Sequence, residues 1–94
     1  MLYNIPQQSG VSLGLDLVAR LVAAYPDTVA GIKDSTGKLD NTLGYCGLGG
    51  GFAVLVGSDP LLNPVLQAGG AGCITAVSNH CAPDLRVIYD GWDK

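Results

Sequence analysis

Val29-Ala30-Gly31-Ile32-Lys33-Asp34 is a short apolar segment that ends in a lysine and an aspartate. An apolar run of this length is typical of a buried strand in a parallel sheet. Because side chains alternate between the two faces of a strand, Val29, Gly31 and Lys33 are expected to share one face. Gly31 is expected to leave empty space beside the lysine stem. The segment therefore predicts a strand over residues 28–34 with a lysine near its carboxyl end.

The chemistry of Lys33 depends on its hydration. A lysine that loses water on burial favours the neutral amine, and a neutral amine can condense with a ketone to form a Schiff base. The alternative is a lysine just past a strand, whose ammonium group reaches water. Spacing alone favours this second interpretation, so the rest of the chain has to decide between the two.

Strand and helix patterns alternate along the whole chain. Apolar runs predict strands over residues 2–5, 28–34, 52–56 and 72–77. Helical patterns follow over residues 12–25, 40–45, 59–68 and from 83 onward. Ser12, Asp40 and Asp59 are expected to cap the first three helices, with Pro60 at the first helical position. The glycines around residues 44–51 predict a weak second helix.

The repeated strand–helix order predicts an α/β fold with a parallel sheet. Each crossover is long enough for a parallel connection, and four such units are half of an eightfold β/α (TIM) barrel. An open doubly wound sheet is the alternative. The barrel is favoured because Tyr3, Lys33, Gly57 and Ile74 fall at or near carboxyl ends of strands, where a barrel carries its active site. We predict one partial TIM-barrel domain over residues 1–94.

Composition limits the classes of partner. Apolar residues make up 48% of the chain and charged residues 14%, so we expect part of the apolar surface to face further protein. The net charge is −3 and no basic patch is present, which argues against nucleic acid. No apolar run reaches membrane-spanning length, and we expect no secretory leader. Three cysteines without a Cys-x-x-Cys pair indicate free thiols in the cytoplasm.

Two other patterns carry no site. Cys73, His80 and Cys81 fit no standard zinc spacing, so we expect no metal. The glycine-rich stretch 47–51 follows a predicted helix and precedes a strand, which is the reverse of the order that a dinucleotide-binding loop requires.

Four motifs in order resemble those of a known family. They are Tyr3-Asn4-Ile5-Pro6, Gly31-Ile32-Lys33-Asp34-Ser35, Val56-Gly57-Ser58-Asp59 and Gly69-Gly70-Ala71-Gly72. In sequence and spacing the chain resembles the dihydrodipicolinate synthase / N-acetylneuraminate lyase family of pyruvate-dependent class I aldolases. The resemblance covers the second half of the family's TIM barrel, from the fifth strand to the eighth helix.

The resemblance implies a role for each matching residue. Lys33 matches the lysine that forms an imine with pyruvate or another 2-oxo acid, and Tyr3 matches the tyrosine that relays protons. Gly57 and Ile74 match positions that line the pyruvate cavity, and Asp59 matches a position that meets substrate hydroxyls. The resemblance thus implies a 2-oxo acid and an aldehyde as substrates, a covalent imine in place of a cofactor, and a homo-oligomer.

The chain also departs from the family pattern. Gln8 stands where the lysine-pathway synthases carry an arginine, and an amide cannot make the bidentate charged contact with a carboxylate that arginine makes. Residues 46–51 are unlike the family's usual helix end. The family's Gly-Thr-Thr-Gly-Glu loop, which binds the 2-oxo acid carboxylate, belongs to the first four strands and does not occur in this sequence.

Two hypotheses follow. The first is a Schiff-base lyase or aldolase that acts through Lys33. The second is a catalytically inactive half-barrel that only self-associates or complements another half, because its strand edges and inner face invite pairing.

Overall fold

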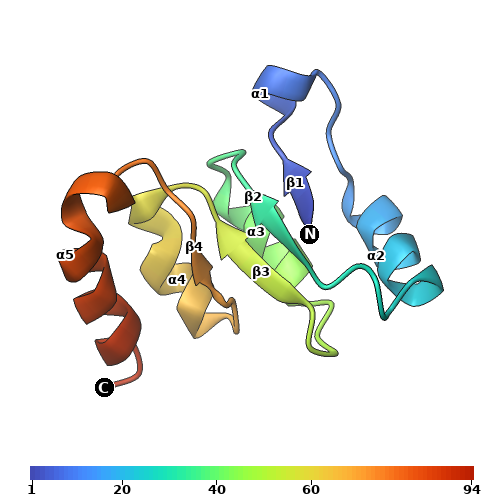
Figure 1. The fold of residues 1–94 in the computed structure, drawn as a ribbon. Helices are drawn as coiled ribbons and strands as arrows, with labels where there is room; N and C mark the ends of the chain where they lie inside the picture. The colour runs from blue at the N-terminus through green and yellow to red at the C-terminus, as the bar shows by residue number, and fades with distance from the viewer.

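The computed structural model describes residues 1–94 and contains one four-stranded parallel sheet with the strand order β1-β2-β3-β4 (Figure 1). The strands are β1 (Leu2–Asn4), β2 (Gly31–Asp34), β3 (Ala53–Val56) and β4 (Gly72–Cys73). The helices are α1 (Pro6–Ser9), α2 (Leu15–Ala24), α3 (Leu39–Cys46), α4 (Leu62–Gln67) and α5 (Ser78–Gly91), with a 3₁₀ helix η1 (Asp59–Leu61) before α4. The predicted α/β class and parallel sheet are confirmed.

The outer face of the sheet carries the core. Ile32 of β2 and Val54 of β3 are buried against Val18 of α2 and Tyr45 of α3. In Figure 1, α3 lies behind β2 and β3. The strand order runs consecutively and never reverses, so the sheet has no switch point of the kind that defines a doubly wound fold. The open-sheet alternative is therefore not supported.

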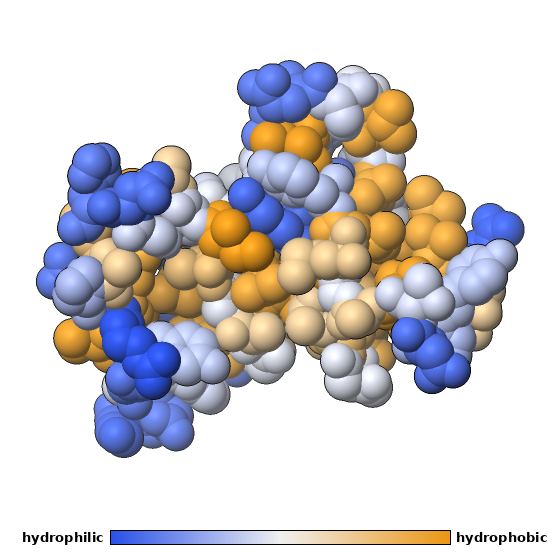
Figure 2. Space-filling view, in the orientation of Figure 1, coloured by the Kyte–Doolittle hydropathy of each residue, from blue (hydrophilic) through white to orange (hydrophobic).

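The inner face of the sheet is open. Tyr3, Lys33 and Leu55 are aligned on this face by the strand register. Tyr3 is 51% exposed, and Ile74, just beyond β4, is 45% exposed. Apolar colours spread across the front of the sheet in Figure 2, which has the orientation of Figure 1. Apolar surface that a complete barrel would enclose thus remains accessible here.

Several predicted boundaries are wrong near the amino-terminal half. Residues 7–11 are predicted as a loop, but Pro6–Ser9 form α1, which starts with proline and is capped by Gly10 with φ of +74°. Ser12 does not cap α2, whose N-cap is Gly14. The strand predicted from residue 28 begins only at Gly31, because the amides of Thr28 and Val29 are turned back to the carbonyl of Tyr25.

The predicted caps of the next helices are displaced by one or two residues. Lys38 and Ser58 stand at the N-cap positions of α3 and η1, and Asp40 and Asp59 lie inside the first turn. An acidic side chain there still interacts favourably with the partial positive charge of the helix start, although it accepts no capping hydrogen bond.

The last strand is shorter and the last helix longer than predicted. β4 ends at Cys73 and α5 begins at Ser78, whose amide donates to Thr75 Oγ1 at 3.2 Å. This side-chain turn ends the extended backbone before residue 77. The backbone leaves helical geometry at Cys81, two residues before Pro83, because proline clashes with the preceding turn.

Gly31 does not leave empty space, contrary to the prediction. A Cβ atom at this position would lie 3.0 Å from Ala53 Cβ and would collide with the Ala53 carbonyl oxygen on the neighbouring strand. The glycine therefore permits the close approach of β2 and β3 rather than making room for the lysine.

We expect Gly31→Ala to lower the free energy of unfolding by about 1–3 kcal/mol, because the backbone of β3 must move. Gly44→Ala in α3 is the matched control. Its Cβ would meet only Leu15 at an ordinary 3.5 Å, so it should stabilise the helix by about 0.5–1 kcal/mol. Urea denaturation of both variants measures the difference in unfolding free energy. Equal denaturation midpoints would contradict the role of Gly31 in the close approach of β2 and β3.

Candidate functional site

Tyr3 and Lys33 form a contact pair on the inner face. They are register partners on β1 and β2, so both side chains leave the sheet in the same direction near the carboxyl ends of the strands. Lys33 Nζ donates a hydrogen bond to Tyr3 Oη at 3.2 Å and lies 4.5 Å from the centre of the tyrosine ring. An amine and a phenol at this distance can exchange a proton directly.

The phenol of Tyr3 is tuned by its neighbours. The Lys33 amine, which donates to the phenol, and then the nearby Ser35 hydroxyl lower the pKa of Tyr3 below its ordinary value of 10.0. The charge of Lys33 acts in the same direction, and partial desolvation opposes it. These contacts favour the phenolate, which is the form that can accept a proton.

Lys33 itself is only half-buried in this chain, and its hydrogen bond with Tyr3 is exposed. Within this chain Lys33 therefore fits the alternative interpretation, a lysine whose amine reaches water, better than that of a lysine that loses its hydration on burial. The reason is the open inner face, because the sheet supplies one wall around the amine and nothing covers the other side.

Ser35 belongs to the same group and was not selected from the sequence. Its amide donates to the Asn4 carbonyl at 2.9 Å, and its carbonyl accepts from Gln7 Nε2 at 2.7 Å. Its side chain lies over Gly57, where an added Cβ would stand 3.0 Å from Ser35 Cβ. The signal that could have found Ser35 is its position two residues after Lys33, which continues the alternation of the strand.

Gly57 and Ile74 lie at the same end of the sheet as the Tyr3–Lys33 pair. The Gly57 amide donates to Asp34 O at 2.8 Å, and the Ile74 amide donates to Val56 O at 3.0 Å. The structure thus places both residues directly beyond strand ends. Neither forms a hydrogen bond with Tyr3 or Lys33, so Gly57 joins the site through Ser35 and Ile74 only borders the open face.

Asp59 acts on a different residue, Cys73, rather than on the Tyr3–Lys33 pair. Its Oδ1 atom is buried without a hydrogen-bond partner, and its charge acts on Cys73. Burial, and then the charge of Asp59, raise the pKa of the Cys73 thiol. Asp59 makes no hydrogen bond with the Tyr3–Lys33 pair, and its predicted role toward substrate hydroxyls stays a prediction.

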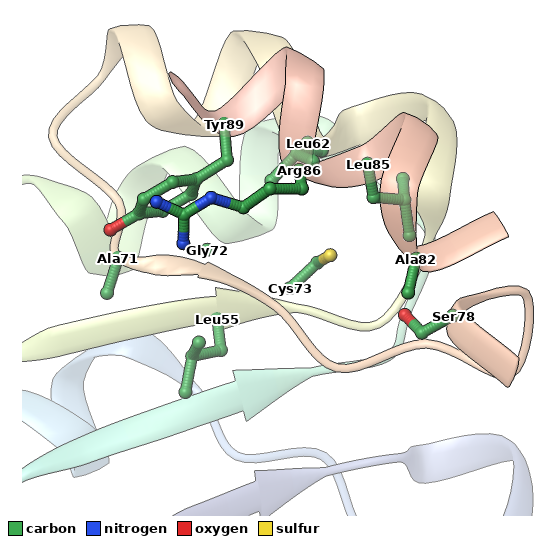
Figure 3. Close-up of a pocket in the computed structure, with 10 residues that line it drawn as sticks. All are labelled: Leu55, Leu62, Ala71, Gly72, Cys73, Ser78, Ala82, Leu85, Arg86 and Tyr89. Carbon is green, nitrogen blue, oxygen red and sulfur yellow. The ribbon is translucent and has the colours of Figure 1, made fainter.

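A separate hollow of about 300 Å³ lies between β4 and α5. Figure 3 shows Arg86 and Tyr89 extending from α5 over β4, with Leu55 contributed by β3. Neither Tyr3 nor Lys33 lines it, so it is distinct from the pair. No cluster of three His, Cys, Asp or Glu side chains is placed to hold a metal ion, and no helix has the length and hydropathy needed to cross a bilayer.

A consecutive parallel sheet with helices on its outer face, and polar side chains at the carboxyl ends on its inner face, defines a segment of a β/α barrel. A family model, described as the dihydrodipicolinate synthetase family, matches residues 1–94. The chain belongs to this family.

Individual relatives agree. A 4-hydroxy-tetrahydrodipicolinate synthase of Erythrobacter litoralis is 37% identical over 86 residues, which is 90% of this chain and 29% of the relative. The crystal structure of dihydrodipicolinate synthase from Agrobacterium tumefaciens superposes with a TM-score of 0.87 at 37% identity, over 93% of this chain and 30% of that one.

Two further structures carry different names within the same fold. YagE of E. coli K12, a prophage protein crystallised with pyruvate, gives a TM-score of 0.82 at 31% identity, over 97% of this chain and 33% of that one. A 2-keto 3-deoxygluconate aldolase of Picrophilus torridus gives 0.82 at 28% identity, over 95% of this chain and 32% of that one. The chain therefore spans about 30% of the length of its relatives, as a partial barrel should.

We expect Lys33→Met to move the pKa of Tyr3 upward toward 10, because the largest contact that favours the phenolate is removed. Nuclear magnetic resonance of the chain labelled with ¹³C at tyrosine Cζ measures this pKa, with the Tyr3 signal assigned from Tyr3→Phe. Lys38→Met removes a charge outside the pair and should leave the value unchanged. A Tyr3 pKa that responds equally to both substitutions would contradict the direct contact.

Proposed function

We propose that this chain carries the imine-forming half of a Schiff-base lyase or aldolase, with Lys33 as the nucleophile toward a 2-oxo acid such as pyruvate. The observation that supports this most directly is the 3.2 Å contact between Lys33 Nζ and Tyr3 Oη at the carboxyl ends of two parallel strands. Membership of the family gives the pair its chemical context.

The proposed reaction begins when the neutral Lys33 amine adds to the keto carbon of the 2-oxo acid. Loss of the carbonyl oxygen as water leaves the imine, and removal of a proton from the adjacent carbon gives an enamine. That carbon then bonds to the aldehyde carbon, and hydrolysis returns the free amine; cleavage runs in reverse. Tyr3 is within reach of Lys33 Nζ and would move protons to and from the reacting centre.

The residues around the pair suggest which substrates fit. Gln8 of α1 is an exposed amide where a charged grip on an aldehyde carboxylate would need arginine. We therefore propose a neutral or hydroxylated aldehyde rather than one recognised by a second carboxylate. The site for the carboxylate of the 2-oxo acid would come from barrel segments outside the 30% of the relatives' length that this chain spans.

The second candidate function is a non-catalytic half-barrel that self-associates or complements another half. The open inner face favours it, because Tyr3 and Ile74 expose apolar surface that only further protein could cover. The homo-oligomer and the cytoplasmic location predicted from the sequence stay predictions. The three free thiols are compatible with that location.

Trapping with pyruvate and borohydride tests the imine. Reduction should fix one pyruvate-derived group on the chain, detected by intact mass and located at Lys33 by peptide mapping. Lys33→Arg should abolish the adduct while Lys38→Arg keeps it. An unchanged mass in folded chain would favour the half-barrel hypothesis, and size-exclusion chromatography would then report self-association.

Replacing Tyr3 by phenylalanine tests the proposed proton relay of Tyr3 separately from the nucleophilic role of Lys33. We expect Tyr3→Phe to slow imine trapping by about 10²-fold, since a positioned acid–base group typically contributes 10²–10⁴-fold. The ring and its contact above the amine are retained, so the loss reports the hydroxyl alone. Tyr25→Phe, at an exposed position distant from β1 in sequence, is the control. Equal trapping rates in all three proteins would rule out a proton relay through Tyr3.

A further inference from the structure

Directly beneath the Tyr3–Lys33 pair, on the opposite face of the same two strands, lies a buried polar cluster. Its members Asn4, Asp34 and Thr42 have no exposed surface. Asn4 follows Tyr3 and Asp34 follows Lys33, and the register pairs Asn4 with Asp34 as it pairs Tyr3 with Lys33. The proposed function uses none of these buried side chains.

Asn4 connects the first strand to three other segments. Its Nδ2 donates to Asp34 Oδ1 and to Tyr45 Oη, both at 3.1 Å, and its Oδ1 accepts from the Leu13 amide at 3.1 Å. The Leu13 amide requires an acceptor, which fixes the orientation of the Asn4 amide. Tyr45 Oη in turn donates to the Leu13 carbonyl. Burial raises the pKa of Tyr45, so this donor keeps its proton.

Asp34 is held entirely by neutral donors. Thr42 Oγ1 donates to Oδ2 at 2.6 Å, and Thr36 Oγ1 and Asn41 Nδ2 donate to the same atom at 3.1 and 3.2 Å. The only ion pair of the structure is Arg86–Asp90, so no cation compensates Asp34. A buried carboxylate of this kind costs free energy to desolvate, and an apolar residue would fill the position more cheaply. Unlike an apolar residue, the Asp34 carboxylate supplies directional hydrogen bonds.

We propose that Asn4 and Asp34 are positioning residues, which lock β1 against β2 in the one register that puts Tyr3 Oη beside Lys33 Nζ. β1 has only three residues, and a slip by one would turn Tyr3 to the outer face. The ladder hydrogen bonds of a short strand tolerate such a slip, but the Asn4–Asp34 bond does not. The role toward catalysis rests on the proposed function, whereas the geometric claim does not.

The experiment uses the Tyr3 pKa, measured by ¹³C nuclear magnetic resonance, as a readout of the distance to Lys33. In Asp34→Asn the amide oxygen should stay with the three donors of Oδ2, so the amide nitrogen would face Asn4 Nδ2 and the Asn4–Asp34 bond would be lost. In this variant and in Asn4→Leu we expect the Tyr3 pKa to rise toward about 10. A purely electrostatic effect of Asp34→Asn would lower it, because a negative charge is removed. The double variant Asn4→Asp/Asp34→Asn restores an amide–carboxylate pair across the strands and should recover at least half of the shift.

Val54→Ala is the matched control, because it weakens the same core while its side chain takes no part in the hydrogen bonds of the polar cluster. It should lower the denaturation midpoint and leave the Tyr3 pKa unchanged. If Asn4→Leu does not fold, Asp34→Asn and the exchanged double variant decide the question. An unchanged Tyr3 pKa in a folded single variant, an equal shift in Val54→Ala, or no recovery in the double variant would overturn the proposal.

Borohydride trapping with pyruvate on the same variants provides the second readout. We expect at least a tenfold slower adduct formation in the single variants and partial recovery in the double variant. We call the hydrogen-bonded Asn4–Asp34 pair the clamp. If the unmodified chain forms no adduct, the proposed function fails, while the Tyr3 pKa values of the variants still test the clamp. If the chain forms the adduct and every variant does so equally fast, the clamp fails while the function stands.

Discussion

The hydrogen bond between Asn4 and Asp34 is the constraint on which the two faces of this sheet jointly depend. Side chains alternate along a strand, so a bond that fixes residues 4 and 34 on the outer face also fixes residues 3 and 33 on the inner face. The packing of the outer face and the position of the Tyr3–Lys33 pair therefore both depend on the register between β1 and β2. The coupling explains why an edge strand of three residues can place a phenol within hydrogen-bond distance of an amine.

The open inner face sets the second constraint, which concerns desolvation. A Schiff-base lysine must give up its proton, and burial is the usual means by which a protein favours the neutral amine. Here the sheet provides one wall, the Tyr3 ring lies over Lys33, and Ser35 adds a hydroxyl beside the phenol. Under the proposed function, the remaining walls would come from barrel segments outside the part of the relatives that this chain spans. This chain therefore contains the contact geometry of Tyr3 and Lys33. The hydration of the Lys33 amine depends on what covers the inner face.

The sequence predicted the alternation of strands and helices, the parallel sheet and the family, because apolar runs and glycine motifs are local signals. It failed where tertiary contacts decide. Gly31 was predicted to leave space beside the Lys33 side chain, whereas in the structure it allows the close approach of Ala53 on β3. Thr75 ends β4 early through a side-chain bond that no periodicity reveals. The proximity of Tyr3 and Lys33 followed from two motifs on adjacent strands. Ser35 was quoted within the lysine motif but was not selected as a site residue, because the strand was predicted to end at Asp34.

Under the proposed function, the polar groups of this chain divide into a centre and a periphery. A dihydrodipicolinate synthase and a 2-keto 3-deoxygluconate aldolase both superpose on this chain, so the segment that it spans is common to proteins with different named activities. Tyr3, Lys33 and the Asn4–Asp34 pair beneath them form the centre on β1 and β2, held by backbone register rather than by flexible loops. Gln8 and Asp59 lie outside it, on α1 and η1. Under the proposed function, variation at such peripheral positions would change the aldehyde partner without disturbing Lys33, because the register that positions Lys33 is set on the opposite face of the sheet.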